Sequence, residues 1–188
     1  MDVVTDDLSH VRLDARQIRT LAHPLRSRLV GELRLNGPAT ATRLAERFAT
    51  NTGATSYHLR QLAEVGLVVD DPGGHGRERW WRAAHDVTSW ERDDFAGDPD
   101  AQAAADWLVS SYARNVADRI DTWNRGVGDE PAEWRAAAQF NDYILRLDPD
   151  DLTAMLGELD DVVTRYTKKR GSRQVLLYLY PVPLEAEK

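Results

Sequence analysis

The chain has 188 residues, of which 42% are hydrophobic and 29% are charged, and its formal net charge is −7. These values exclude a mainly disordered chain and are typical of a globular protein with one large core or two small ones. The sequence has no apolar run of membrane-spanning length and no Cys, and its acidic start, MDVVTDDLSH, lacks the apolar segment of a signal peptide. We therefore expect a soluble, cytoplasmic protein.

The first half of the sequence predicts four short helices. The first runs from Asp14 to Leu21, and Pro24 suits the first turn of the second, which ends at Asn36-Gly37-Pro38. Thr40 is expected to cap the third helix and Asn51 the fourth, since both side chains can accept a backbone hydrogen bond. The side chains expected to face the core are Leu25, Leu29, Val30 and Leu33 in the second helix, Leu44 and Phe48 in the third, and Thr55, Leu59 and Leu62 in the fourth.

A β-hairpin is expected directly after these helices. Leu67–Asp70 and Arg77–Arg82 have the composition of strands, and the segment between them, Asp71–Gly76, contains three Gly and one Pro. The last three helices followed by a hairpin, with a tight link between the third and fourth helices, have the element order of a winged helix-turn-helix.

Three segments carry a family resemblance over residues 14–85. They are LAHPLRSRLVGEL, ATRLAERFATNTGATSYHLRQLAEVGLV and GRERWWR, and in this order and spacing they resemble the ArsR-like winged-helix transcriptional regulators. The resemblance implies a homodimer in which each subunit presents one helix to the major groove of DNA.

The fourth helix has an unusual outer face. Thr52, Gly53, Ser56, Tyr57 and Arg60 point away from the core stripe, and no acidic residue occurs in this helix before Glu64. Hydroxyl groups and Arg can contact phosphates or base edges, and Gly lets the backbone approach closely. A solvated face is the alternative interpretation, but the preceding helix, the tight link and the basic hairpin favour DNA.

The hairpin tip is the second candidate contact. Alternation places Arg77 and Arg79 on one face and Glu78 on the other, which suits the minor groove or the phosphate backbone. Asp70 and Asp71 at its base oppose such a contact. His58 is interpreted as a packed, hydrogen-bonded side chain, with a phosphate contact as the alternative.

The charge is divided unevenly along the chain. Residues 10–85 contain 12 Arg, no Lys and seven acidic residues, a net charge of +5, so the remainder carries −12. This division predicts two modules with different partners, a DNA-binding domain at residues 1–86 and an acidic domain at residues 87–188.

The second half is expected to fold as an α+β domain. It weakly resembles the C-terminal regions of longer actinobacterial-type regulators, and the whole chain is predicted to be mainly α with small β. Residues 129–140 fit either a helix or a strand. The predicted elements are a long helix at Pro99–Asn124, a strand at Tyr143–Leu147, a helix from Asp148 to the cluster Lys168-Lys169-Arg170, and a strand at Gln174–Tyr180, which together suggest a strand–helix–strand unit.

The long helix carries an apolar stripe. The stripe consists of Leu108, Tyr112, Val116 and Ile120, and Trp107 and Trp123 lie near its margins. A dimer interface or an intramolecular core is the favoured interpretation, and a pocket for an apolar or aromatic effector is the alternative.

Metal and catalytic sites are not predicted. The chain has no Cys, its five His include no helical pair four residues apart, and none occurs after His85, so the zinc ligands of the resembling family's metal sensors are missing. Phosphate-binding loops, dinucleotide Gly motifs and nucleophile motifs are also absent from the sequence. We expect a homodimeric DNA-binding regulator, a repressor, without metal or cofactor. A protein-interaction module built on a winged helix is the alternative.

Overall fold

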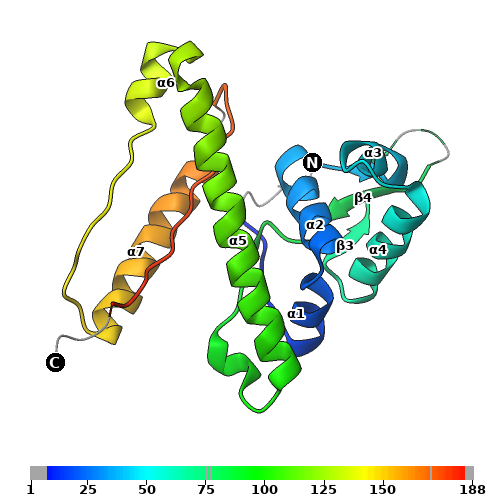
Figure 1. The fold of residues 1–188 in the computed structure, drawn as a ribbon, viewed down its shortest axis with the longest axis horizontal. Helices are drawn as coiled ribbons and strands as arrows, with labels where there is room; N and C mark the ends of the chain where they lie inside the picture. Colours follow the sequence, from blue (N-terminus) through cyan, green and yellow to red (C-terminus); the bar gives the residue numbers. More distant parts are fainter. Residues whose placement is uncertain (1–7, 75, 77, 170, 185–188) are drawn as a thin grey trace, which may run out of the picture. The chain divides into compact units, whose positions relative to one another are not determined.

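A computed structural model of the chain describes residues 8–74, 76, 78–169 and 171–184. The chain divides into two compact units, one that ends at Tyr112 and one that begins at Ala113. They are called the N-terminal and the C-terminal unit below, and in Figure 1 their colours run from blue to green and from green to red.

The four helices predicted for the N-terminal unit are confirmed. They are α1 (Ala15–Leu21), α2 (Pro24–Asn36), α3 (Ala41–Arg47) and α4 (Thr52–Glu64). Each helix begins after a residue whose side chain accepts a hydrogen bond from a backbone N–H of the first turn. Asp14 and Gln17 form a reciprocal capping box at α1, Thr40 accepts from the N–H of Arg43, and Asn51 accepts from the N–H of Ala54.

The predicted wing is present as a three-stranded antiparallel sheet. Its order is β2 (Ala39–Thr40), β4 (Trp80–Ala83) and β3 (Val68–Asp70), with β4 in the centre. Gly74 allows the turn between β3 and β4 to pass close to Trp80, because a Cβ at this position would lie 2.3 Å from the Trp80 ring. The element order therefore is that of a winged helix-turn-helix.

The core of the N-terminal unit also includes residues that follow the winged helix in the sequence. Its fully buried side chains include Ile18, Leu21, Leu29, Leu59 and Leu62. Phe95 from the short helix η1 (Arg92–Phe95) is 2% exposed, and Leu108 from the long helix α5 (Pro99–Gly126) is fully buried in the same cluster. The first turns of α5 therefore pack with the winged helix as one folded unit.

Two features of this packing were not predicted from the sequence. A parallel pair of short strands joins β1 (His10–Arg12) to β5 (Val87–Ser89). The acidic stretch Trp90–Asp100 supplies carboxylates to Arg side chains of the N-terminal segment: Asp94 accepts from Arg12 Nε at 2.9 Å, and Asp98 pairs with Arg19 at 2.5 Å. The predicted division of roles at residue 86 stays a prediction, whereas the division by packing falls at Tyr112.

The C-terminal unit is helical, which settles the ambiguity at residues 129–140. It contains the second half of α5, the short helix η2 (Val127–Asp129), α6 (Ala132–Ala137) and α7 (Pro149–Thr167). The predicted start of α7 is confirmed, with Pro149 in the first turn and Asp150 and Asp151 at the positive end of the helix dipole, but the side chain of Asp148 before it makes no capping hydrogen bond. No described residue after Leu108 is buried.

The predicted strands of this unit are wrong. Residues 143–147 and 174–180 have irregular backbone, and neither segment joins a sheet in the described part of the chain. Their β-branched and aromatic side chains favour extended backbone, but a strand also requires a hydrogen-bonded neighbour, which a short sequence pattern does not supply. The strand–helix–strand unit is therefore reduced to its helix, and the predicted fold class, mainly helical with small sheets, is confirmed.

Candidate nucleic-acid interface

The outer face of α4 is free of the protein core. Thr55, Leu59 and Leu62 are fully buried, as the spacing predicts. Thr52, Gly53 and Arg60 are exposed, Ser56 is half-buried, and the large ring of Tyr57 is 51% exposed. Tyr57 is the one exposed large hydrophobic side chain that the described residues of the N-terminal unit present. Thus α4 offers small hydroxyl groups, an aromatic ring and a guanidinium group on one accessible face.

The link between α3 and α4 fixes the start of this face. Phe48 N donates to Leu44 O at 3.1 Å, and Thr50 N donates to Ala45 O at 2.9 Å, so the chain turns directly after α3. Ala49 completes the turn at a φ of 50°, a left-handed conformation that normally favours Gly. The backbone of the link is therefore held by α3 as well as by the cap at Asn51.

The N-terminal end of α4 is suited to an anion. Its first turn contains no acidic residue, and the unpaired N–H groups and the helix dipole give this end a partial positive charge. Gly53 lies beside the cap, since a Cβ there would approach Asn51 Oδ1 to 3.3 Å. A small residue at position 53 thus preserves the cap and also leaves the backbone accessible.

A groove connects α4 to the wing. Its volume is about 240 Å³, and the residues of the predicted interface that line it are Thr52, Ser56, Arg60 and Arg79. The sequence did not predict the other lining residues, Thr40, Ala41, Thr42, Glu78 and Trp81, because their proximity depends on how β2 and β4 pair across 40 residues of sequence.

Arg79 is held in place by its neighbours within the wing. Its guanidinium group pairs with the Asp70 carboxylate, with Nη2 to Oδ2 at 2.5 Å, and lies 4.0 Å from the centre of the Trp81 ring. This pairing lowers the pKa of Asp70 and raises the pKa of Arg79, mainly through the side-chain hydrogen bond. Arg79 remains about half exposed, but its charge is already compensated by Asp70. The sequence pattern placed both residues near the wing and did not show that they bind each other.

The two sides of the wing differ as the alternation predicts. Glu78 Oε1 accepts a hydrogen bond from the Thr42 hydroxyl at 3.0 Å, whereas Arg79 turns to Asp70. Arg77, the other predicted wing contact, lies outside the described residues.

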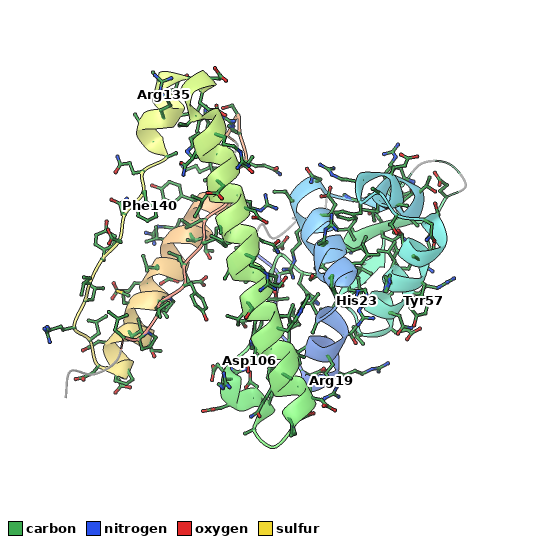
Figure 2. All side chains as sticks on the ribbon, in the orientation of Figure 1. Arg19, His23, Tyr57, Asp106, Arg135 and Phe140 are labelled. Carbon is green, nitrogen blue, oxygen red and sulfur yellow. The ribbon has the colours of Figure 1, made fainter. Side chains whose placement is uncertain are left out.

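Behind α4, two imidazole rings pack against each other. The rings of His23 and His58 have centroids 4.5 Å apart, and His58 meets the edge of Tyr57 at 5.3 Å; His23 and Tyr57 are labelled in Figure 2. His23 Nδ1 accepts from the N–H of Leu25, so this nitrogen carries no proton. Burial lowers the pKa of both imidazoles, and the nearby charge of Arg26 lowers them further. The prediction that His58 is packed agrees with this geometry, although its buried Nδ1 makes no hydrogen bond within the described part of the protein.

The residues predicted for a dimer interface or an effector pocket fall in different environments. Leu108 is fully buried inside one chain, and Tyr112 packs against the same core, with its ring 6.1 Å from that of Trp90 and its pKa raised by burial. Trp107 also contacts this core. Val116 and Trp123 are half-buried, and Ile120 is 42% exposed. Leu108 therefore cannot face a partner in this conformation, whereas Val116, Ile120 and Trp123 can.

Two other kinds of site are not seen in the described ranges. No group of three or more His, Asp or Glu side chains is placed to hold a metal ion there. None of the helices in this part of the chain combines the length and the apolar content needed to cross a bilayer.

These features define a winged helix-turn-helix unit with an accessible outer face on α4 that carries no acidic residue before Glu64. The family model for a helix-turn-helix domain matches residues 21–70, which include α2, α3, α4 and β3. The chain is 42% identical over 60 residues to the HTH-type transcriptional regulator NmtR of Mycobacterium tuberculosis (strain ATCC 25618 / H37Rv); the match covers 32% of this chain and 49% of that relative. The resemblance to ArsR-like winged-helix regulators predicted from the sequence is confirmed for this region. The chain spans about half the length of NmtR, the curated relative that it matches.

Solved structures are similar over about half of the chain. A possible transcriptional regulator for arsenical resistance is 34% identical, with 56% of this chain and 96% of that chain covered and a TM-score of 0.33. The homodimeric winged helix-turn-helix DNA-binding domain (fragment 1–100) of a possible ArsR-family transcriptional regulator from Mycobacterium bovis is 24% identical, with 53% and 77% covered and a TM-score of 0.36. At these TM-scores the superpositions support no conclusion about this chain.

Proposed function

We propose that this protein is a homodimeric, sequence-specific DNA-binding transcriptional regulator. One observation carries the proposal: the exposed face of α4 has hydroxyl groups, Tyr57 and Arg60 and no acidic side chain before Glu64, the last residue of the helix, although the protein as a whole is acidic. A face of this kind at a capped helix N-terminus is complementary to phosphates and to the base edges of the major groove.

The contacts divide into two kinds. Ser56 and Arg60 lie far enough along α4 to reach base edges, where Arg can bind guanine through two hydrogen bonds. Thr52 and the N–H groups around Gly53 lie at the start of the helix and suit phosphates, and the Tyr57 hydroxyl, one residue beyond Ser56, can also bind a phosphate. Arg77 and Arg79 of the wing would add backbone or minor-groove contacts, and the Asp70 carboxylate restrains the Arg79 contribution.

Two copies of the chain would bind a symmetric operator with recognition helices about 34 Å apart. The exposed half of α5, with Val116, Ile120 and Trp123, is a candidate for the contact between the copies. We further propose that the protein is a cytoplasmic repressor, that it has no enzymatic activity, and that a small apolar or aromatic compound bound near Trp107 or Trp123 releases it from DNA. Such a ligand would act by binding one arrangement of the dimer better than the other.

The proposal is tested by measuring the affinity of the full chain for fragments of its source genome over a series of salt concentrations. A specific fragment should be bound tightly, with an affinity that falls steeply as salt rises. Arg60→Ala should weaken this binding by about 1–3 kcal/mol. Arg19→Ala is the matched control, because Arg19 is paired with Asp98 and should leave the affinity nearly unchanged.

The alternative is a protein-interaction module that uses the winged helix as a scaffold. This alternative would be favoured by two results together: all genomic fragments bind with the same affinity, and Arg60→Ala and Arg19→Ala have the same effect on that affinity.

A further inference from the structure

The C-terminal unit exposes an unusual amount of apolar surface. Apart from Tyr57, every exposed large hydrophobic side chain in the described residues lies between Ile120 and Leu184. Ile144 is 86% exposed, Val175 is 73% exposed and Tyr166 on α7 is 67% exposed. Apolar patches of this size on a soluble chain mark a surface that another molecule covers.

The apolar stripe of α7 has a symmetric spacing. Going outward from Leu159, apolar side chains occur three, four and seven residues away in both directions along the helix. The stripe consists of Leu152, Met155, Leu156, Leu159, Val162, Val163 and Tyr166, and none of these side chains is buried. An identical helix running in the opposite direction would therefore match this stripe, with Leu159 meeting its own copy.

The charges at the two ends of α7 fit the same arrangement. Asp148, Asp150 and Asp151 lie at the start of the helix, and Lys168 and Lys169 follow its end. In an antiparallel pair centred on Leu159, position 150 of one helix lies level with position 168 of the other, so the acidic start of each α7 lies alongside the basic end of its partner. A twofold interface must be complementary to itself, and this helix meets that requirement in shape and in charge.

We propose that a second copy of this chain covers the C-terminal unit, with the two α7 helices antiparallel and Leu159 at the twofold axis. A stable interface uses about 20–30 residues from each partner. The helix α7 together with the apolar residues 171–184 supplies a surface of this order. Since Val116, Ile120 and Trp123 belong to the same unit, one twofold axis can serve this contact and the α5 contact of the proposed dimer.

One pair of residues opposes the association. Glu158 and Asp160 flank Leu159, and in a twofold antiparallel pair each of them lies on the same side of the contact as its own copy in the partner subunit. The repulsion between these like carboxylates at the centre provides a specific test, because replacing one acid by its neutral amide removes it.

The first experiment uses the absence of natural Cys in this chain. In the full-length protein, Leu159→Cys should form an intermolecular disulfide under mild oxidation, since facing residues at a helix contact come within the 4.4–6.8 Å Cα separation that a disulfide requires. Asp161→Cys is the matched control, because position 161 points about 200° away around the helix. Efficient cross-linking at position 159 but not at 161 supports the arrangement. No cross-link at 159, or equal cross-linking at both positions, overturns it.

The second experiment measures the dimer dissociation constant by sedimentation. Glu158→Gln should lower this constant several-fold, because it removes a pair of like charges, and Glu158→Lys should lower it less, because it places two ammonium groups there instead. An unchanged or higher constant for Glu158→Gln, or a wild-type chain that stays monomeric at every concentration, contradicts the proposal. Neither experiment requires DNA, so its failure is distinguishable from failure of the proposed regulatory function.

Discussion

The two units of this protein handle their apolar side chains in opposite ways. The N-terminal unit buries Leu, Ile, Val, Trp and Phe side chains in one cluster, and among its described residues it leaves one large ring, Tyr57, exposed on the proposed DNA-binding face. The C-terminal unit buries none of its described side chains and exposes most of its Leu, Val and Tyr residues. The two units therefore differ in whether a single chain is enough to bury their apolar side chains.

Buried and exposed apolar side chains both occur along the single helix α5. Ala101, Ala104, Ala105 and Leu108 are buried, and Tyr112 is held beside Arg34 and Thr88, whereas Ile120 is exposed. The small Ala side chains allow the first turns of α5 to approach the winged helix closely. The later turns, from Ala113 onward, belong to the C-terminal unit.

The largest predicted effect compares two positions on this helix. Leu108→Ala removes a fully buried side chain and should lower the free energy of unfolding by about 2–5 kcal/mol. Ile120→Ala, measured in dilute solution, should cost less than about 1 kcal/mol, since most of the benefit of burial is absent there. Denaturant unfolding measures both values, and similar costs for the two variants would contradict the division of α5.

A smaller effect concerns the two imidazoles behind α4. His23 and His58 have pKa values below their ordinary value of 6.5 in the folded protein, so the unfolded chain takes up protons first as the pH falls. Stability should therefore be fully present above about pH 7.5 and should decrease progressively as the pH drops below 6.5. Arg26 also faces this pair, and its guanidinium group keeps its charge in this range.

Unfolding measured at pH 7.5 and pH 5.5 checks this prediction. The loss of stability between the two pH values should be smaller for His58→Leu than for the wild type. An equal loss in both proteins would mean that the imidazole pair does not cause it.

At the link before α4, a substitution is expected to increase the stability of the protein. Ala49→Gly should stabilise the protein by about 0.5–1 kcal/mol, because Ala49 has a φ of 50° and Gly adopts this conformation without strain. Ala45→Gly in α3 should instead destabilise the protein by about 1 kcal/mol or more, since it weakens a helix and removes a buried methyl group. Thermal unfolding should shift in opposite directions for these two variants, and a loss in both would contradict the account of the link.

The smallest effect concerns the wing. Asp70→Asn removes the negative charge that holds Arg79, and it should tighten DNA binding by less than about 1 kcal/mol and steepen the dependence on salt by about one ion. Asp71→Asn is the control that leaves the Arg79 pairing intact. If the two variants showed the same affinity and the same dependence on salt, the pairing of Arg79 with Asp70 would not limit its contact with DNA.

The sequence predicted the N-terminal helices well because their signals are local. Thr40 and Asn51 cap the helices where the pattern places them, and Thr55, Leu59 and Leu62 face the core at helical spacing. The outer face of α4 follows from the same spacing, so its exposed residues could be predicted without the structure.

The errors arise where the outcome depends on residues distant in the sequence. Residues 143–147 and 174–180 have strand-like composition, but whether they pair depends on a neighbour that their own sequence does not specify. The stripe on α5 was predicted as one surface because periodicity cannot show that Leu108 meets the winged helix while Ile120 does not. Likewise, the charge pattern of the wing showed acids near Arg79 but not that Asp70 binds it.

Amide hydrogen exchange of the full-length protein at two concentrations tests the contrast between the units most directly. Above and below the dimer dissociation constant, the amides of α2 and β4 should be protected equally, since the N-terminal unit is complete in one chain. Protection of α7 should be weak in the dilute sample and should rise strongly in the concentrated one. Strong protection of α7 in the monomer would contradict the conclusion that the C-terminal unit requires a second copy of the chain.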